Sequence, residues 1–71
     1  MTESEKIRKL SGLSRAAFSR KYQIPIRTLE DWDAGKSAPP LYVLNLLETV
    51  VRYDMQAKEN LEATLAEIVK N

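Results

Sequence analysis

The chain has 71 residues, a formal net charge of +1, and neither cysteine nor histidine. This length allows one small domain, and the missing residue types exclude a disulfide framework and argue against a structural zinc site. Without cysteine and histidine the chain also lacks two common catalytic residues, a nucleophile and a general base, and it has no glycine-rich phosphate loop. We therefore predict that it is not an enzyme and that it binds no cofactor and no metal.

The N-terminal segment is acidic and polar, unlike a signal peptide, and no apolar run approaches the length of a membrane span. We therefore expect no membrane contact and a bacterial or phage cytoplasmic setting. Between Lys6 and Arg27 there are seven basic residues and no acidic one, whereas from Ser37 onward there are three basic and five acidic residues. This asymmetry predicts a basic face at one end of the molecule, with an ordinary solvated helix surface as the alternative.

The first helix is expected to begin at Thr2, because Thr2 and Glu5 have the spacing of a capping box. Ile7 and Leu10 are predicted to form its apolar face. Gly12 is expected to end it, since glycine readily adopts the left-handed conformation of a helix C-terminus.

Ser14 is expected to cap a second helix that runs to about Tyr22. Ala17, Phe18 and Tyr22 share one side of this helix, and Leu13 just before the cap can pack against them. A third helix opens at Pro25, whose fixed φ suits a first helical turn.

In the third helix, Leu29 and Trp32 are predicted to face inward, and Gly35 to end it. Pro39 and Pro40 restart the chain for a fourth helix. From Leu41 to Asn71 there is neither glycine nor proline, and residues at alternating steps of three and four form an imperfect heptad stripe: Leu47, Val50, Asp54, Ala57, Leu61, Thr64 and Ile68.

This C-terminal region could form one long helix or break near Tyr53-Asp54 into a fourth and a fifth helix. We divide the chain accordingly into residues 1–53 and a C-terminal segment, 54–71, of the same domain. Leu61, Leu65 and Ile68 are expected to form either intramolecular core or a subunit or partner interface. We favour a homodimer, because so small a core is marginal by itself.

From about Leu10 to Leu47 the chain resembles the phage-repressor (Cro-like, XRE) helix-turn-helix family. The residues that carry the resemblance are the Ser14 cap, Ala16-Ala17-Phe18, Ile24, Leu29, Trp32 and the Asp33-Ala34-Gly35 stop. The resemblance implies an all-α, lambda-repressor-like bundle of four to five helices with a long C-terminal helix or helix pair.

The resemblance also implies that residues 25–33 form a recognition helix in the major groove of double-stranded DNA. Its base-reading residues would be Ile26, Arg27, Glu30 and Asp31. Arg15, Lys36 and Ser37 would contact the DNA backbone, where Lys21 and Thr28 are further candidates. Asp33 matches a family acid that often holds the loop after this helix.

The chain departs from the family pattern in three ways. Gln23 stands where glycine is usual, so a left-handed conformation there would cost about 1 kcal/mol. Arg15 stands where glutamine is common. Glu30 and Asp31 would repel phosphates, although a close carboxylate can accept a hydrogen bond from cytosine. Arg27 could bind guanine or pair with Asp31 or Glu30 on its own helix.

These observations predict a small transcriptional regulator, a repressor, that binds DNA as a homodimer. The alternative is an antitoxin-like or regulatory subunit that holds a protein partner, a toxin or co-regulator, through its C-terminal helix.

Overall fold

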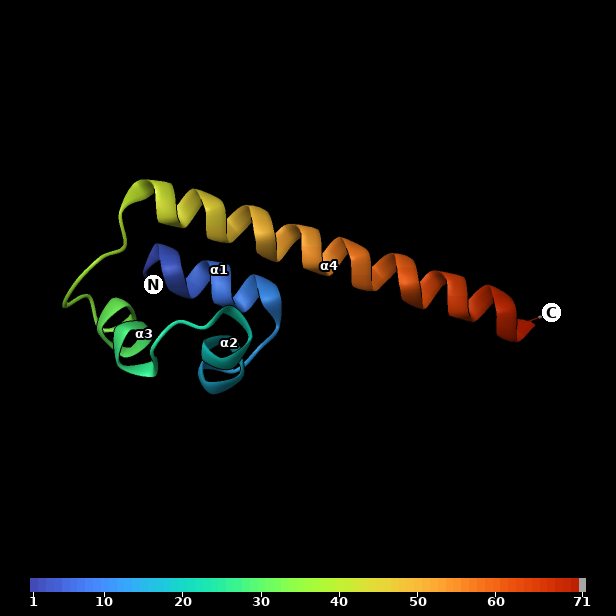
Figure 1. Cartoon of the computed structure of the whole chain (residues 1–71), viewed down its shortest axis with the longest axis horizontal. Helices are drawn as coiled ribbons and strands as arrows, with labels where there is room; N and C mark the ends of the chain where they lie inside the picture. Colours follow the sequence, from blue (N-terminus) through green and yellow to red (C-terminus); the bar gives the residue numbers. More distant parts are fainter. Residues whose placement is uncertain (71) are drawn as a thin grey trace.

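Each of four helices contributes one buried apolar side chain to a common core. The computed structural model describes residues 1–70, with side chains described to Ile68. Its helices are α1 (Glu3–Ser11), α2 (Arg15–Tyr22), α3 (Ile26–Asp33) and α4 (Leu41–Lys70). The core side chains are, in the same order, Ile7, Phe18, Leu29 and Val51. The predicted all-α bundle with a long C-terminal helix is therefore confirmed (Figure 1).

The ends of α1 lie where the capping residues predict them. The Thr2 hydroxyl accepts a hydrogen bond from the Glu5 amide, and the Glu5 carboxylate accepts one from the Thr2 amide. These hydrogen bonds with Thr2 hold the pKa of Glu5 below its usual value of 4.5. At the other end, Gly12 has φ 74° and its amide donates to the Lys9 carbonyl at 3.1 Å.

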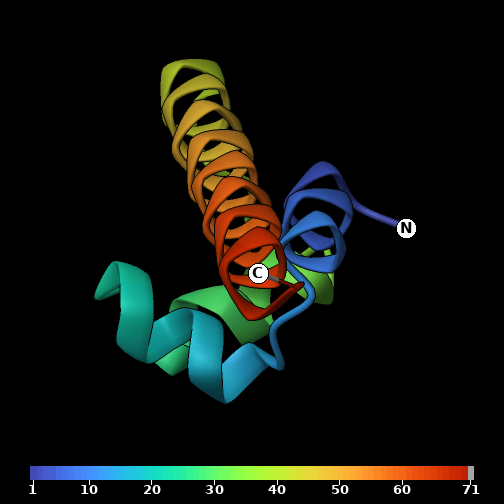
Figure 2. The same cartoon turned by 90° about the vertical axis from the view of Figure 1, so that its right-hand side faces the viewer.

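One prediction about α1 is wrong, because Leu10 does not share the buried face with Ile7. Leu10 is exposed, whereas Ser4 and Ser11 are buried with Ile7. The buried line follows steps of three and four residues, as a helix face requires. Figure 2 shows α4 running beside α1.

The helix-turn-helix unit consists of α2, a three-residue connection and α3. The Ser14 hydroxyl caps α2 by accepting from the Ala17 amide at 3.2 Å. Gln23 adopts the left-handed conformation expected of it, with φ 55° and ψ 42°. The Ser19 hydroxyl donates to the Ile24 carbonyl at 2.6 Å, and the Ile24 amide donates to the Ser19 carbonyl at 3.1 Å. These two bonds fix the turn and therefore the direction in which α3 leaves it.

The fourth helix is continuous through Tyr53-Asp54, so the open question of a break is settled in favour of one helix. Met55 is the last of its residues packed against the core. From Gln56 to Ile68 every side chain is exposed, and Figure 1 shows this half of α4 projecting beyond the other helices. The result is an elongated molecule of 52 × 22 × 21 Å.

The start of α4 is set by the proline pair that precedes it. The Pro40 carbonyl accepts from the Val43 and Leu44 amides, so the helix starts directly after the proline pair. Leu41, the first residue of the helix, is exposed. Among the residues that the structure describes, no helix is both long and apolar enough to traverse a lipid bilayer.

Candidate nucleic-acid interface

The outer face of α3 is the surface that the sequence predicted to read DNA. Leu29 is buried and Trp32 packs partly against the core, which turns the opposite side of the helix to solvent. Glu30 is exposed, the Arg27 side chain is 84% exposed, and Ile26 is exposed at the edge of the buried face. The three residues are therefore free to meet a large ligand without any change in the bundle.

The N-terminus of α3 offers oriented hydrogen-bond donors. Pro25 occupies the capping position and supplies no side-chain hydrogen bond. The first amide with a helical acceptor is that of Leu29, which donates to the Pro25 carbonyl at 3.2 Å. The amides of residues 26–28 precede that bond, so they point outward with the positive end of the helix dipole.

Asp33 links three helices through one carboxylate oxygen. Its Oδ2 accepts from Arg8 Nη2 of α1 at 3.3 Å and from Arg15 Nε of α2 at 2.8 Å. The Asp33 side chain is only 7% exposed, that of Arg8 16% and that of Arg15 43%. Arg8 Nε is buried without a partner, so this guanidinium depends on Asp33 for compensation of its charge.

The loop after α3 is held by main-chain hydrogen bonds and not by the Asp33 side chain. The Asp31 carbonyl accepts from the Lys36 amide at 2.9 Å and from the Ser37 amide at 3.4 Å. The loop is therefore fixed by the backbone of α3, while Asp33, which the resemblance assigned to this task, joins α3 to α1 and α2 instead.

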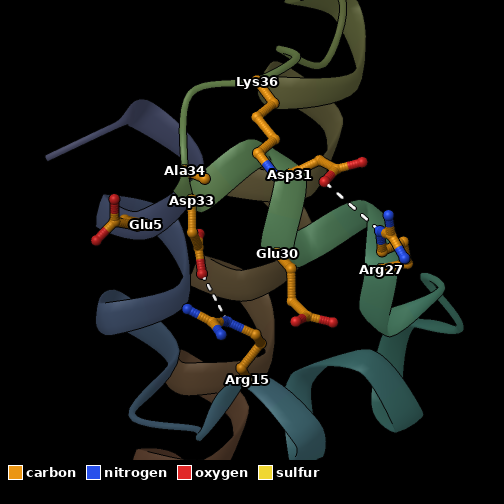
Figure 3. Close-up of a pocket in the computed structure, with 8 residues that line it drawn as sticks. All are labelled: Glu5, Arg15, Arg27, Glu30, Asp31, Asp33, Ala34 and Lys36. Atoms are coloured by element: carbon orange, nitrogen blue, oxygen red, sulfur yellow. Dashed lines mark hydrogen bonds and ion pairs between the residues drawn. The ribbon is translucent and has the colours of Figure 1, made fainter.

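A shallow hollow of about 500 Å³ separates α3 from the start of α2. It brings together the candidate residues Arg15, Arg27, Glu30, Asp31 and Lys36 (Figure 3). Glu5, Asp33 and Ala34 complete its lining. Three cations and four acids thus meet at one surface, and this part of the molecule is charge-mixed rather than basic.

Ion pairs neutralise most of the basic run that the sequence showed. Arg27 Nε lies 3.8 Å from Asp31 Oδ1 one turn along α3, in addition to the pairs of Arg8 and Arg15 with Asp33. Lys6 pairs with Glu3 at 3.3 Å. The expected basic face is therefore broken up by acids from other parts of the chain.

Three of the predicted backbone-contact residues lie apart from this hollow. Lys21 Nζ is 3.6 Å from Asp54 Oδ2 of α4 and lies over the Tyr22 ring. Ser37 borders a second hollow beside Trp32. Thr28 is half-buried on α3.

Tyr22 and Asp54 form a pair that the sequence analysis missed. The Tyr22 hydroxyl donates to Asp54 Oδ2 at 2.7 Å and ties α2 to α4. Burial, followed by this hydrogen bond and the carboxylate charge, raises the pKa of Tyr22 to about 12. The sequence marked Asp54 only as part of a possible helix break and of the heptad stripe, so the pattern gave no signal for this role.

Arg8 was also missed as a structural residue. It follows Ile7 directly and precedes Ser11 by three positions, which places it beside the buried line of α1. That position was the available signal, since a long cation beside a buried face requires an acid partner.

No grouping of three or more side chains suited to holding a metal ion occurs in the described part of the chain.

A scan against models of protein families, a search of curated proteins and a search of solved structures found no match to this chain.

Proposed function

We propose that the chain is a small sequence-specific DNA-binding regulator of the helix-turn-helix type, acting in the cytoplasm as a homodimer and repressing transcription. The observation that carries this proposal is the geometry of α3. It is held on a short turn against α2, its inner side is fixed by Leu29, and its outer side presents Arg27 with an uncapped N-terminus. A helix presented in this way fits the major groove. The likeness to the phage-repressor family adds support from the residues alone.

In this proposal Arg27 reads a guanine. A guanidinium can donate two hydrogen bonds to guanine O6 and N7, worth about 1–3 kcal/mol of discrimination. Asp31, already 3.8 Å from Arg27, braces the side chain rather than competing for it. Ile26 would contact a thymine methyl, and Glu30 would accept a hydrogen bond from a cytosine amine.

Arg15 and Lys36 flank α3 and would contact phosphates. Because acids balance the cations of this surface, we expect weak binding to non-specific DNA and a modest dependence on salt. Two phosphate contacts per subunit would give a slope of log K against log salt of about −3.6 for a dimer.

The test is a titration of the chain with a randomised duplex pool at low salt, followed by sequencing of the bound fraction. Arg27→Ala should relax one base position in each half-site, whereas Arg15→Ala should weaken all sequences alike. Arg52→Ala is the matched control, since Arg52 pairs with Glu48 on α4, outside the surface of α3. Absence of binding to any duplex would reject the proposal, and equal losses on every sequence for both variants would reject the assigned roles.

A second candidate function is supported by the exposed apolar residues of the projecting half of α4. Leu61, Leu65 and Ile68 are 60%, 51% and 64% exposed, so the structure excludes the reading that they form core within one chain. An antitoxin-like subunit would bind a toxin or co-regulator there. Light scattering on the purified chain separates the two cases: a dimer supports self-association, and a monomer supports a missing partner.

A further inference from the structure

The fourth helix carries two apolar stripes, and only one of them faces the bundle. Leu44, Leu47, Val51 and Met55 pack against the core. The second stripe is exposed throughout and consists of six apolar residues and Thr64, whose hydroxyl donates to the Asn60 carbonyl. Its members are Leu46, Val50, Tyr53, Ala57, Leu61, Thr64 and Ile68. At 100° per residue the two stripes lie roughly a third of a turn apart.

The spacing of the exposed stripe reads the same in both directions. Its steps are 4, 3, 4, 4, 3 and 4 residues, and Ala57 stands at the centre. Leu46, Ala57 and Ile68 are separated by eleven residues each. An eleven-residue repeat corresponds to 3.67 residues per turn, close to that of a straight helix, so the stripe is not the heptad seam expected from the sequence.

We propose that this stripe binds the same stripe of a second copy of the chain, with the two α4 helices antiparallel and Ala57 at the two-fold axis. Because the spacing is symmetric, each member of the stripe then meets another member at the same height, with Val50 opposite the partner's Thr64. Tyr53 faces the partner's Leu61, and Leu46 faces the partner's Ile68. The small Ala57 side chain lets the two helices approach where they meet.

An apolar hollow beside the exposed stripe would be covered by the α4 helix of a second copy. An apolar hollow of about 250 Å³ lies along the first half of the stripe, between α4 and the turn after α2. It is lined by Tyr22, Ile24, Val43, Leu46, Leu47 and Val50. The antiparallel arrangement lays the projecting half of the partner's α4 along this hollow, so that the partner's Leu65 covers Leu47.

Charge also favours the antiparallel orientation. Asp54 and Lys58 lie on the same flank of the stripe, one turn apart. Antiparallel pairing brings Lys58 within reach of the partner's Asp54, and symmetry makes this contact twice. Asp54 already accepts from the Tyr22 hydroxyl at Oδ2 and lies 3.6 Å from Lys21, so Lys58 would join a pair that exists within each copy.

The antiparallel pairing of α4, which rests on the homodimer of the proposed function, sets the distance between the two α3 helices. The two-fold axis of an antiparallel helix pair is perpendicular to the plane of the helices, so both bundles lie on one side of the pair. Trp32 of α3 and Leu44 of α4 both border the hollow described earlier beside Trp32. Leu44 is thirteen residues from Ala57, which separates the two copies of α3 by about 39 Å along α4 at 1.5 Å per residue. Successive major grooves on one face of DNA are about 34–36 Å apart.

Disulfide trapping tests the orientation, because the chain has no cysteine of its own. The double variant Tyr53→Cys/Leu61→Cys should form a covalent dimer on mild oxidation. The single variants Tyr53→Cys and Leu61→Cys should not, since equivalent positions in the antiparallel pair are about 12 Å apart along the helix. Both residues are exposed, so the substitutions leave the bundle intact, which circular dichroism will verify.

The matched control is Arg52→Cys/Glu62→Cys, two exposed positions at equal distances from Ala57 but off the stripe, and it should not crosslink. Crosslinking of either single variant would establish a parallel pair and overturn the inference. A monomeric mass of the unmodified chain by light scattering would overturn it as well and favour a different protein as occupant. A trapped dimer that binds no duplex would leave the inference standing and remove only the proposed function.

Discussion

Asp33→Asn tests whether one carboxylate holds the first three helices together. The substitution keeps the side-chain size and one acceptor oxygen but removes the charge that faces Arg8 and Arg15. Breaking a buried ion pair costs about 3–5 kcal/mol, whereas exposed pairs contribute about 0–1 kcal/mol. Since Asp33 and Arg8 are mostly buried and Arg15 is not, we expect a loss of about 2–3 kcal/mol.

This loss is a large part of what so small a domain can have. At about 0.05–0.15 kcal/mol per residue, the whole chain is expected to be stable by about 4–10 kcal/mol. Urea denaturation followed by far-ultraviolet circular dichroism measures the difference, with an unchanged m-value as the sign that only stability has changed. The urea midpoint of the variant should be clearly lower.

Asp31→Asn is the matched control, because Asp31 lies on the same helix and pairs with the exposed Arg27. It should cost less than about 1 kcal/mol, as should Arg15→Gln. If Asp33→Asn and Asp31→Asn were equally stable, the buried carboxylate would not be a structural centre. A large effect of Arg15→Gln would mean that Arg15 serves the fold rather than a phosphate.

Three further outcomes are expected. Val51→Ala should lower the free energy of unfolding by about 2–3 kcal/mol, because Val51 is fully buried, whereas Thr49→Ala, at an exposed position off the stripe, should cost under about 0.5 kcal/mol; equal losses in urea denaturation would contradict the assigned core. Gln23→Gly should raise stability by about 0.5–1 kcal/mol in the same assay by relieving a left-handed backbone, and a decrease would show that the glutamine side chain holds the turn. The pKa of Tyr22 is raised from 10 in the unfolded chain to about 12 in the folded one. The protonated Tyr22 therefore contributes its full share to the free energy of unfolding below pH 10, and this share is lost progressively as the pH rises to 12. Tyr22→Phe should remove that part of the decline in stability, and an identical pH profile would refute the role of its bond to Asp54.

The helix ends could be predicted because they depend on local chemistry. Thr2 and Ser14 act within a few residues of their own position and cap α1 and α2 as predicted. Pro25, expected in the first turn of α3, lies one position earlier, at the N-cap. The left-handed conformation of Gln23 was indicated by the resemblance, because glycine is usual at that position of the family, and the residue adopts it with φ 55°.

The tertiary ion pairs and hydrogen bonds between side chains could not be predicted because their partners are distant in the sequence. Asp33 lies 25 residues from Arg8, and Tyr22 lies 32 residues from Asp54. A charge count along the chain treats each cation as free, so it predicted a basic face where folding brings acids to meet the cations.

The stripe predicted along α4 mixed two surfaces. Its first member, Leu47, packs against the core, whereas Val50, Ala57 and Ile68 belong to the exposed stripe. Periodicity along a single sequence shows that apolar residues recur, but it cannot assign them to two partners a third of a turn apart. Only the position of the bundle on α4 separates them.

Folding of the projecting half of α4 is expected to depend on the concentration of the protein. From Gln56 onward no side chain of the described residues is buried, and an isolated helix of this length is marginal in water. The backbone there is expected to exchange its amide hydrogens quickly in dilute solution and slowly once a binding surface covers it. The number of copies in a cell would then determine how much of the rod is folded, and unassembled chains would offer proteases an accessible tail.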